Sequence, residues 1–71
     1  MNLQKIRYIN CIIVEFGRKF KLAPRWAFQY LYTYKGLELI DKHYEVEHLL
    51  PLQDTLKSLT DYCKRHGGTI G

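Results

Sequence analysis

Apolar residues recur every three or four positions near the start of the chain, which is the spacing of a helix with one buried face. The residues of this stripe are Ile6, Ile9, Ile13, Phe16 and Phe20, with Ile12 at its edge. Polar residues occupy most of the opposite face, and Asn2 is a suitable N-cap. The pattern predicts a first helix over residues 3–20, long enough to form the spine of a hydrophobic core.

A second segment, residues 24–34, has a pattern that is typical of two different structures. Its aromatic residues fall on alternate positions, as in a strand. They are Trp26, Phe28, Tyr30, Tyr32 and Tyr34. The boundaries favour a helix, since Pro24 stands at an opening position and Gly36 suits a left-handed cap. No second strand is available for pairing, so we expect a helix over 24–34.

Apolar residues cover a wide arc of this second helix, about 240° on a helical wheel. A helix that is apolar over such an arc lies between two others or keeps one face for a partner. The residues that we expect to face the core are Ala27, Phe28 and Leu31. The residues left for a partner, one turn apart on a flank, are Trp26, Tyr30 and Tyr34.

Two further helices are predicted in the second half of the chain, over residues 37–45 and 51–65. The first is short, and the second has Pro51 at its start and the pair Gly67 and Gly68 after its end. The residues expected to close the core are Leu37, Ile40, Leu56 and Leu59. We therefore expect an all-α fold, a compact bundle of four helices. It forms one domain over residues 1–71, with residues 68–71 as a frayed tail.

The charge of the chain is unevenly divided. The formal net charge is +4, of which residues 1–36 contribute +6 (seven Lys/Arg, one acid) and residues 37–71 contribute −2 (four Lys/Arg, six acids). A positive first half suits an acidic partner, either nucleic acid or an acidic protein surface. Three of its bases, Arg18, Lys19 and Lys21, are also explained by a helix C-terminus, where positive charge is favourable.

Cysteine and histidine residues give only weak signals for chemistry. Cys63 and His66 have a ligand-like spacing, with His43 and His48 as further candidates, but structural zinc sites use paired ligands at both ends. Cys63 lies on an apolar stripe and Cys11 faces away from one, so no disulfide between them is expected. No nucleophile–base motif or phosphate-binding loop is present. We expect no catalytic, metal-binding or cofactor-binding residues, and a protein that is not an enzyme.

Nucleic-acid binding is the alternative function. The second and third predicted helices, joined around Lys35 and Gly36, outline a helix-turn-helix with the third as the recognition helix. Residues 37–45 carry a net charge of −2, which is the wrong sign for a polyanionic groove. Aromatic residues beside Arg25 and Lys35 would instead stack on unpaired bases.

Four stretches resemble an uncharacterised family, a domain of unknown function found in short bacterial helical proteins. They are AFQYL at 27–31, KGLELI at 35–40, HYEVEH at 43–48 and DYCKRHGG at 61–68. Members are often encoded beside proteins resembling ADP-ribosyltransferases, an arrangement like that of a toxin-type protein and its small partner. The resemblance implies an antitoxin-like or regulatory binding protein, and it supplies no catalytic residues.

The sequence thus predicts a cytoplasmic protein–protein interaction module. Its longest apolar run, residues 11–14, is far too short to cross a membrane. The expected partner-binding residues are Trp26, Tyr30, Tyr34, Arg18, Lys21 and Arg25. A protein partner with an acidic rim and an apolar pocket would suit them, and the ADP-ribosyltransferase-like neighbour is the partner that the resemblance implies. Without a partner, the same surface predicts self-association into a homodimer.

Overall fold

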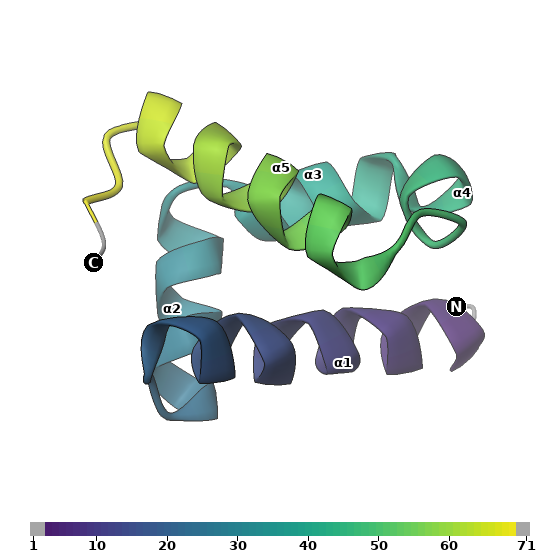
Figure 1. The fold of residues 1–71 in the computed structure, drawn as a ribbon, viewed down its shortest axis with the longest axis horizontal. Helices are drawn as coiled ribbons and strands as arrows, with labels where there is room; N and C mark the ends of the chain where they lie inside the picture. Colours follow the sequence, from purple (N-terminus) through teal and green to yellow (C-terminus); the bar gives the residue numbers. More distant parts are fainter. Residues whose placement is uncertain (1–2, 70–71) are drawn as a thin grey trace.

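The computed structural model describes residues 3–69, and five helices lie within that range (Figure 1). They are α1 (Leu3–Phe20), α2 (Pro24–Thr33), α3 (Gly36–Lys42), α4 (Tyr44–Glu47) and α5 (Leu52–Arg65). The expected all-α bundle is confirmed. The predicted third helix differs in detail, because the chain bends at His43 and divides it into α3 and the single-turn α4. Helix α4 also extends two residues beyond the predicted third helix, to Glu47.

The helices form two layers joined by α2 (Figure 1). Helix α1 makes one layer, and α3, α4 and α5 make the other. Helix α2 stands across the C-terminal end of α1 and leads from one layer to the other. Helix α1 contacts α2, α3 and α5, while α3 contacts α5 directly, so each of the four longer helices borders the same interior.

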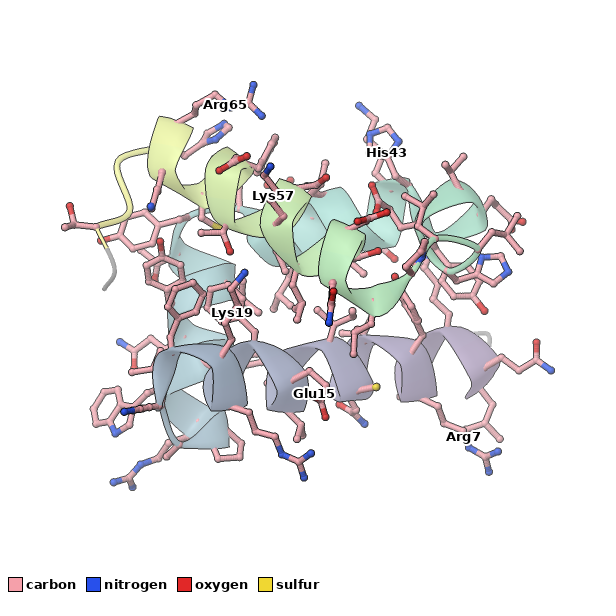
Figure 2. All side chains as sticks on the ribbon, viewed as in Figure 1. Arg7, Glu15, Lys19, His43, Lys57 and Arg65 are labelled. Carbon is pink, nitrogen blue, oxygen red and sulfur yellow. The ribbon has the colours of Figure 1, made fainter. Side chains whose placement is uncertain are left out.

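The core lies where these helices meet. Its nine buried residues are Ile12, Ile13, Phe16, Ala27, Leu31, Ile40, Leu56, Leu59 and Cys63. The first predicted stripe is therefore correct in its centre, but it is rotated toward Ile12, which is fully buried, and away from Ile6, which reaches the surface. Charged side chains such as Arg7 and Arg65 point outward from the two layers (Figure 2).

A tight reversal after α1 sets the crossing direction of α2. The Leu22 N–H donates to the Gly17 carbonyl at 2.7 Å and the Lys21 N–H to the Arg18 carbonyl at 3.4 Å, which together form a Schellman motif. Lys21 takes the left-handed backbone conformation, with φ of 58°. A Cβ on Gly17 would lie 2.6 Å from the Leu22 carbonyl oxygen, so the reversal requires glycine at position 17.

The turn between α2 and α3 corrects the role that the sequence assigned to Gly36. Lys35 is the left-handed residue, with φ of 67°, and Gly36 is the buried first residue of α3. A Cβ on Gly36 would lie 2.9 Å from Cys63 Sγ, 2.9 Å from Leu31 Cδ2 and 3.0 Å from Leu59 Cδ1. Glycine is needed at this position for close packing of α3 on α2 and α5, and it does not serve as a cap.

Helix α5 ends as its glycine pair predicts. Gly67 has φ of 93°, and the N–H groups of Gly67 and Gly68 donate to the carbonyls of Lys64 and Cys63 at 3.1 and 2.9 Å. Gly68 is buried, and a Cβ there would lie 2.6 Å from Tyr30 Oη, so the end of α5 is held against α2. Positions 1, 2, 70 and 71, including the expected N-cap at Asn2, lie outside the described residues.

Candidate functional site

The apolar and aromatic residues of helix α2 fall into three sets by burial. Ala27 and Leu31 face the core and are fully buried. Tyr30 and Tyr34 are half-buried against that core. The aromatic side chains that remain exposed are Trp26 at 51%, Phe28 at 49% and Tyr32 at 65%.

Phe28 is the main error in the predicted core. The contact stripe of α2 is narrow, because this helix crosses the end of α1 instead of lying along it (Figure 1). Phe28 is about 100° around the helix from Ala27, which is beyond the edge of that stripe. Its ring instead pairs with Tyr32 on the outside, with ring centroids 6.1 Å apart.

A shallow groove, here called the Trp26 groove, brings together the three aromatic residues expected to bind a partner. Its lining residues are Leu22, Trp26, Gln29, Tyr30, Thr33, Tyr34 and Thr69. The Tyr30 ring stacks on Phe16 at 5.5 Å and meets Tyr34 at 4.9 Å, so the two tyrosines form a fixed floor. Burial raises the pKa of the Tyr30 hydroxyl, and Cys63 and Tyr34 raise it further by smaller amounts. Trp26 forms an exposed wall.

The three basic residues expected at the same surface are divided by the structure. The Arg25 guanidinium lies 5.2 Å from the centre of the Trp26 ring, at the border of the groove. Lys21 is exposed at the reversal after α1. Arg18 lies elsewhere, because it binds Glu15 at 3.0 Å and lines a different groove. That groove runs between α1 and α5, the helices that carry Lys19 and Lys57 (Figure 2).

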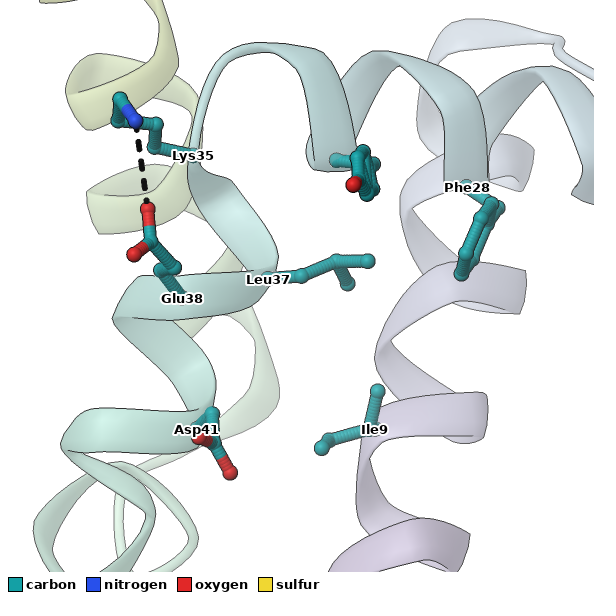
Figure 3. A pocket seen from close by; sticks show the side chains of 7 residues that line it. Ile9, Phe28, Lys35, Leu37, Glu38 and Asp41 are labelled. Atoms are coloured by element: carbon teal, nitrogen blue, oxygen red, sulfur yellow. Dashed lines mark ion pairs between the residues drawn. The ribbon is translucent and has the colours of Figure 1, made fainter.

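A further groove, here called the Phe28 groove, lies between α1, α2 and α3 (Figure 3). It is lined by Ile9, Phe28, Tyr32, Lys35, Leu37, Glu38 and Asp41. Leu37 projects from α3 into the space that Phe28 and Ile9 border from the other side. Sequence reasoning missed this groove, since it joins three helices that are separate in the sequence. The one local signal was the spacing of Phe28 and Tyr32, one helical turn apart on a flank.

The end of α4, the start of α5 and the turn between them expose a second set of apolar residues. The exposed residues there are Val46, Leu49, Leu50 and Leu52. Leu49 and Leu50 lie between α4 and α5, and Val46 and Leu52 lie in the adjoining helices. This area is distant in sequence from α2, and exposed residues here serve as controls for experiments on the α2 grooves.

The cysteine and histidine side chains are buried, lie against backbone carbonyls or are far from other reactive groups. Cys11 is exposed and Cys63 is buried, and both thiols are free. The Nδ1 atoms of His48 and His66 lie 2.6 and 2.9 Å from the carbonyl oxygens of Tyr44 and Tyr62. Within residues 3–69, no three His, Cys, Asp or Glu side chains gather where they could hold a metal ion. None of the helices in that range has the length and apolar character needed to cross a membrane.

The buried thiol of Cys63 predicts a specific loss of stability at alkaline pH. Burial raises its pKa from 9.0 to about 11, against a smaller opposing effect of a hydrogen bond with the Gly36 backbone. The unfolded chain therefore loses this proton first, and the contribution is complete below pH 9 and is lost as pH rises toward 11. We expect the free energy of unfolding to fall by roughly 1–3 kcal/mol over that range.

Chemical denaturation of the wild type and of Cys63→Ala, below pH 9 and near pH 11, measures this effect. Burial also raises the pKa values of Tyr8 and Tyr30, and those contributions remain in both proteins. The variant should therefore lose less stability than the wild type over the same range. Equal losses in the two proteins would contradict the assignment to Cys63.

Comparison with known proteins places the chain in a family. A model of the family described as "Protein of unknown function (DUF3791)" matches residues 7–66, which are 60 of the 71 residues. The match spans most of α1 and the whole of α2 to α5, and it confirms the resemblance found in the sequence. No curated protein and no solved structure matches the chain.

Proposed function

The chain belongs to the DUF3791 family of proteins of unknown function, and we propose that it is a non-catalytic module that binds another protein. The observation that carries this proposal is the Trp26 groove. Half of the Trp26 side chain is exposed beside a floor of two ordered tyrosines. A small domain gains nothing in stability from leaving its one tryptophan in contact with water, whereas a partner would bury it.

The composition of the groove supports protein as the ligand. Trp, Tyr and Arg are the residue types most enriched among those that dominate binding energy at protein interfaces. Tyr30 and Tyr34 are already held by contacts with Phe16 and with each other, so little rotamer entropy is lost on binding. The Arg25 guanidinium beside Trp26 adds a positive charge to an otherwise uncharged lining.

The charge around the groove indicates what the partner presents. Among residues 3–69, no carboxylate lies within 4.0 Å of the Arg25 guanidinium. Lys21 is also exposed, and it makes no ion pair with any residue of that range. A suitable partner would place an apolar side chain in the groove and acidic residues beside Arg25 and Lys21.

The resemblance to a family encoded beside ADP-ribosyltransferase-like proteins suggests which partner to test first. We propose an enzyme of that toxin-like type, with this chain as its antitoxin-like or regulatory subunit in the cytoplasm. Binding by a rigid surface would then cover or reshape the enzyme while the small chain contributes no catalytic group. This part of the proposal rests on the resemblance, and the surface itself rests on the groove.

The alternative function, nucleic-acid binding, receives less support from the arrangement of charges. Three basic residues of the positive first half already form ion pairs within the protein. Lys5, Arg18 and Lys35 pair with Asp41, Glu15 and Glu38 at 2.6, 3.0 and 3.6 Å. A phosphate backbone is bound by Lys and Arg side chains that are free of ion pairs and gathered on one face of the protein.

Replacement of Trp26 by alanine tests the proposal. When the chain is co-expressed with the neighbouring gene product, Trp26→Ala is expected to weaken the complex by about tenfold or more, as for other central aromatic anchors. Co-purification and titration calorimetry measure the loss, and circular dichroism checks that the helices are retained. Leu49→Ala is the matched control, since Leu49 is 76% exposed but lies after α4.

Arg18→Ala distinguishes the Trp26 groove seen in the structure from the surface predicted from the sequence, which included Arg18. Because Arg18 lines a different groove, its replacement should leave binding unchanged, whereas Arg25→Ala should weaken it. Binding that survives both Trp26→Ala and Arg25→Ala would exclude the Trp26 groove as the contact surface.

A further inference from the structure

Helix α2 lies between the Trp26 groove and the Phe28 groove, and a small hollow on its exposed side connects them. The hollow is lined by Arg25, Phe28, Gln29 and Tyr32. It shares Phe28 and Tyr32 with the Phe28 groove, and it shares Gln29 with the Trp26 groove. The surface is therefore continuous from one groove to the other across α2.

The exposed residues of α2 cover a wide arc of the helix. At about 100° per residue, Gln29, Arg25 and Tyr32 follow Trp26 in that order around the helix, and Phe28 lies about 160° from Trp26. All five residues are exposed, and Figure 1 shows α2 at one edge of the molecule. Both edges of the arc are aromatic, so the helix presents an apolar side chain on each flank.

The spacing along α2 has the same character. Arg25, Phe28, Gln29 and Tyr32 stand at positions i, i+3, i+4 and i+7. This spacing is typical of the contact face of a helix that binds in a groove of another protein. The rings of Phe28 and Tyr32 lie side by side on that face, with centroids 6.1 Å apart.

The Trp26 groove is small for a protein interface. Seven of the described residues line it, whereas a stable interface takes about 20–30 residues from each partner. The hollow and the Phe28 groove add eight further residues, which brings the continuous surface to fifteen. The contact must extend beyond the Trp26 groove, and across α2 it meets further exposed aromatic rings, which are enriched at interfaces.

Charge on this surface is concentrated at Arg25. Its guanidinium lies 5.2 Å from the centre of the Trp26 ring, and it also lines the hollow, so it stands between the two grooves. Each charged group that lines the Phe28 groove already has an ion-pair partner in the chain. The pairs are Lys35 with Glu38 at 3.6 Å and Asp41 with Lys5 at 2.6 Å. A partner therefore needs an acidic group for Arg25 and apolar side chains for the Phe28 groove.

We infer, on the basis of the proposed function, that the partner receives α2 in a cleft, with one wall in the Trp26 groove and the other in the Phe28 groove (Figure 3). A flat surface touches only one side of a helix, whereas the arc from Trp26 to Phe28 spans almost half of its circumference. The cleft is apolar on both walls and acidic where it faces Arg25. It is wide enough for a helix of about 10–12 Å in diameter.

The inner side of α2 holds the helix in place before the partner binds. Ala27 and Leu31 are fully buried, and Tyr30 and Tyr34 pack against the core. A helix that is already ordered loses little conformational entropy on binding. The free chain therefore presents the whole arc in the geometry that the cleft requires.

Truncation of side chains on both flanks of α2 tests the cleft. Titration calorimetry with the proposed partner, the ADP-ribosyltransferase-like protein, gives the dissociation constant of each variant. Phe28→Ala and Tyr32→Ala should each weaken binding by about tenfold or more, as expected for Trp26→Ala. Because Trp26 and Phe28 share no groove, the double variant should show roughly the product of their two losses.

Hydroxyl-radical footprinting of the wild type tests the same arc without any substitution. In the free chain, Trp26, Phe28 and Tyr32 should be oxidised, because all three are exposed. In the complex, all three should be protected together. Leu49, which is 76% exposed after α4, should react equally in both samples.

Matched controls separate lost contacts from lost folding. Phe28 and Tyr32 lie outside the core, so circular dichroism and urea denaturation should show both alanine variants to be folded with nearly unchanged midpoints. Leu49→Ala removes an exposed apolar side chain elsewhere and should bind like the wild type.

The results distinguish failure of the cleft from failure of the proposed function. If Trp26→Ala weakens binding but Phe28→Ala and Tyr32→Ala do not, the cleft is refuted and the proposed function stands. A wild type that does not bind this protein would refute the proposed partner, and the cleft with it. Self-association that Phe28→Ala abolishes, beside unchanged binding of the partner, would assign the Phe28 groove to a second copy and also overturn the inference.

Discussion

Replacement of Phe16 by alanine is expected to remove about 3–5 kcal/mol from the free energy of unfolding. Phe16 is fully buried and is the largest residue of the core. Its ring stacks with Tyr30 at 5.5 Å and contacts Phe20 at 4.9 Å, so the cavity left by alanine is bordered by rings held from several sides. A domain of this length has a total stability of roughly 4–10 kcal/mol, and the variant should be close to unfolding.

Urea denaturation followed by circular dichroism measures this loss, with Val14→Ala as the matched control. Val14 lies on the same helix but is 38% exposed, so its truncation should cost under about 1 kcal/mol. If Phe16→Ala were no more destabilising than Val14→Ala, the core would not be centred where α1 crosses α2.

Replacement of Gly36 by alanine is expected to cost about 1–3 kcal/mol, even though alanine is the better helix former. The added Cβ would lie 2.9–3.0 Å from atoms of Leu31, Leu59 and Cys63. All three side chains are fully buried, so none can move aside without disturbing its own neighbours. The same denaturation experiment measures the loss.

Replacement of the preceding Lys35 by glycine is the companion variant. Lys35 holds the left-handed conformation, which costs an ordinary residue roughly 1–2 kcal/mol, so glycine there should be neutral or slightly stabilising. The opposite pattern would be an unchanged free energy of unfolding for Gly36→Ala and a lower one for Lys35→Gly. It would indicate that Gly36 is the helix cap and would contradict the packing described above.

The helices were predictable because each depends on a periodic pattern within its own segment. The stripe of α1, the proline that opens α2 and the glycine pair after α5 all act within a few residues. The turn at Lys35 and Gly36 was not predictable in the same way. A glycine that follows a helix suits a left-handed cap in any sequence, and only the approach of Cys63 and Leu59 from α5 shows that it is needed for space.

The candidate surfaces also combine features that one helix determines with features that depend on how the helices pack. Trp26, Tyr30 and Tyr34 could be grouped from sequence because they lie one turn apart on one helix. The separation of Arg18 from this group depends on how α1 meets α2, and the sequence contains no direct signal for that crossing. The exposure of Phe28 has the same origin, since it follows from the narrow contact between these two helices.

The proposed binding surface is coupled to the core through Tyr30. Its ring lines the Trp26 groove on one side and stacks on Phe16 on the other, and its hydroxyl is buried without a hydrogen-bond partner among residues 3–69. The floor of the groove is therefore as rigid as the core beneath it. Substitutions at Phe16 should weaken binding as well as stability, whereas substitutions at Trp26 should affect binding alone.

The most direct test of the binding surface is a nuclear magnetic resonance titration of the isotope-labelled chain with the proposed partner, the ADP-ribosyltransferase-like protein. We expect the largest changes in amide signals on α2, and on Leu22 and Thr69, which border the Trp26 groove with it. Signals of α5 from Leu52 to Leu59 should change little. Changes centred on the apolar residues after α4, with α2 unaffected, would contradict the central claim.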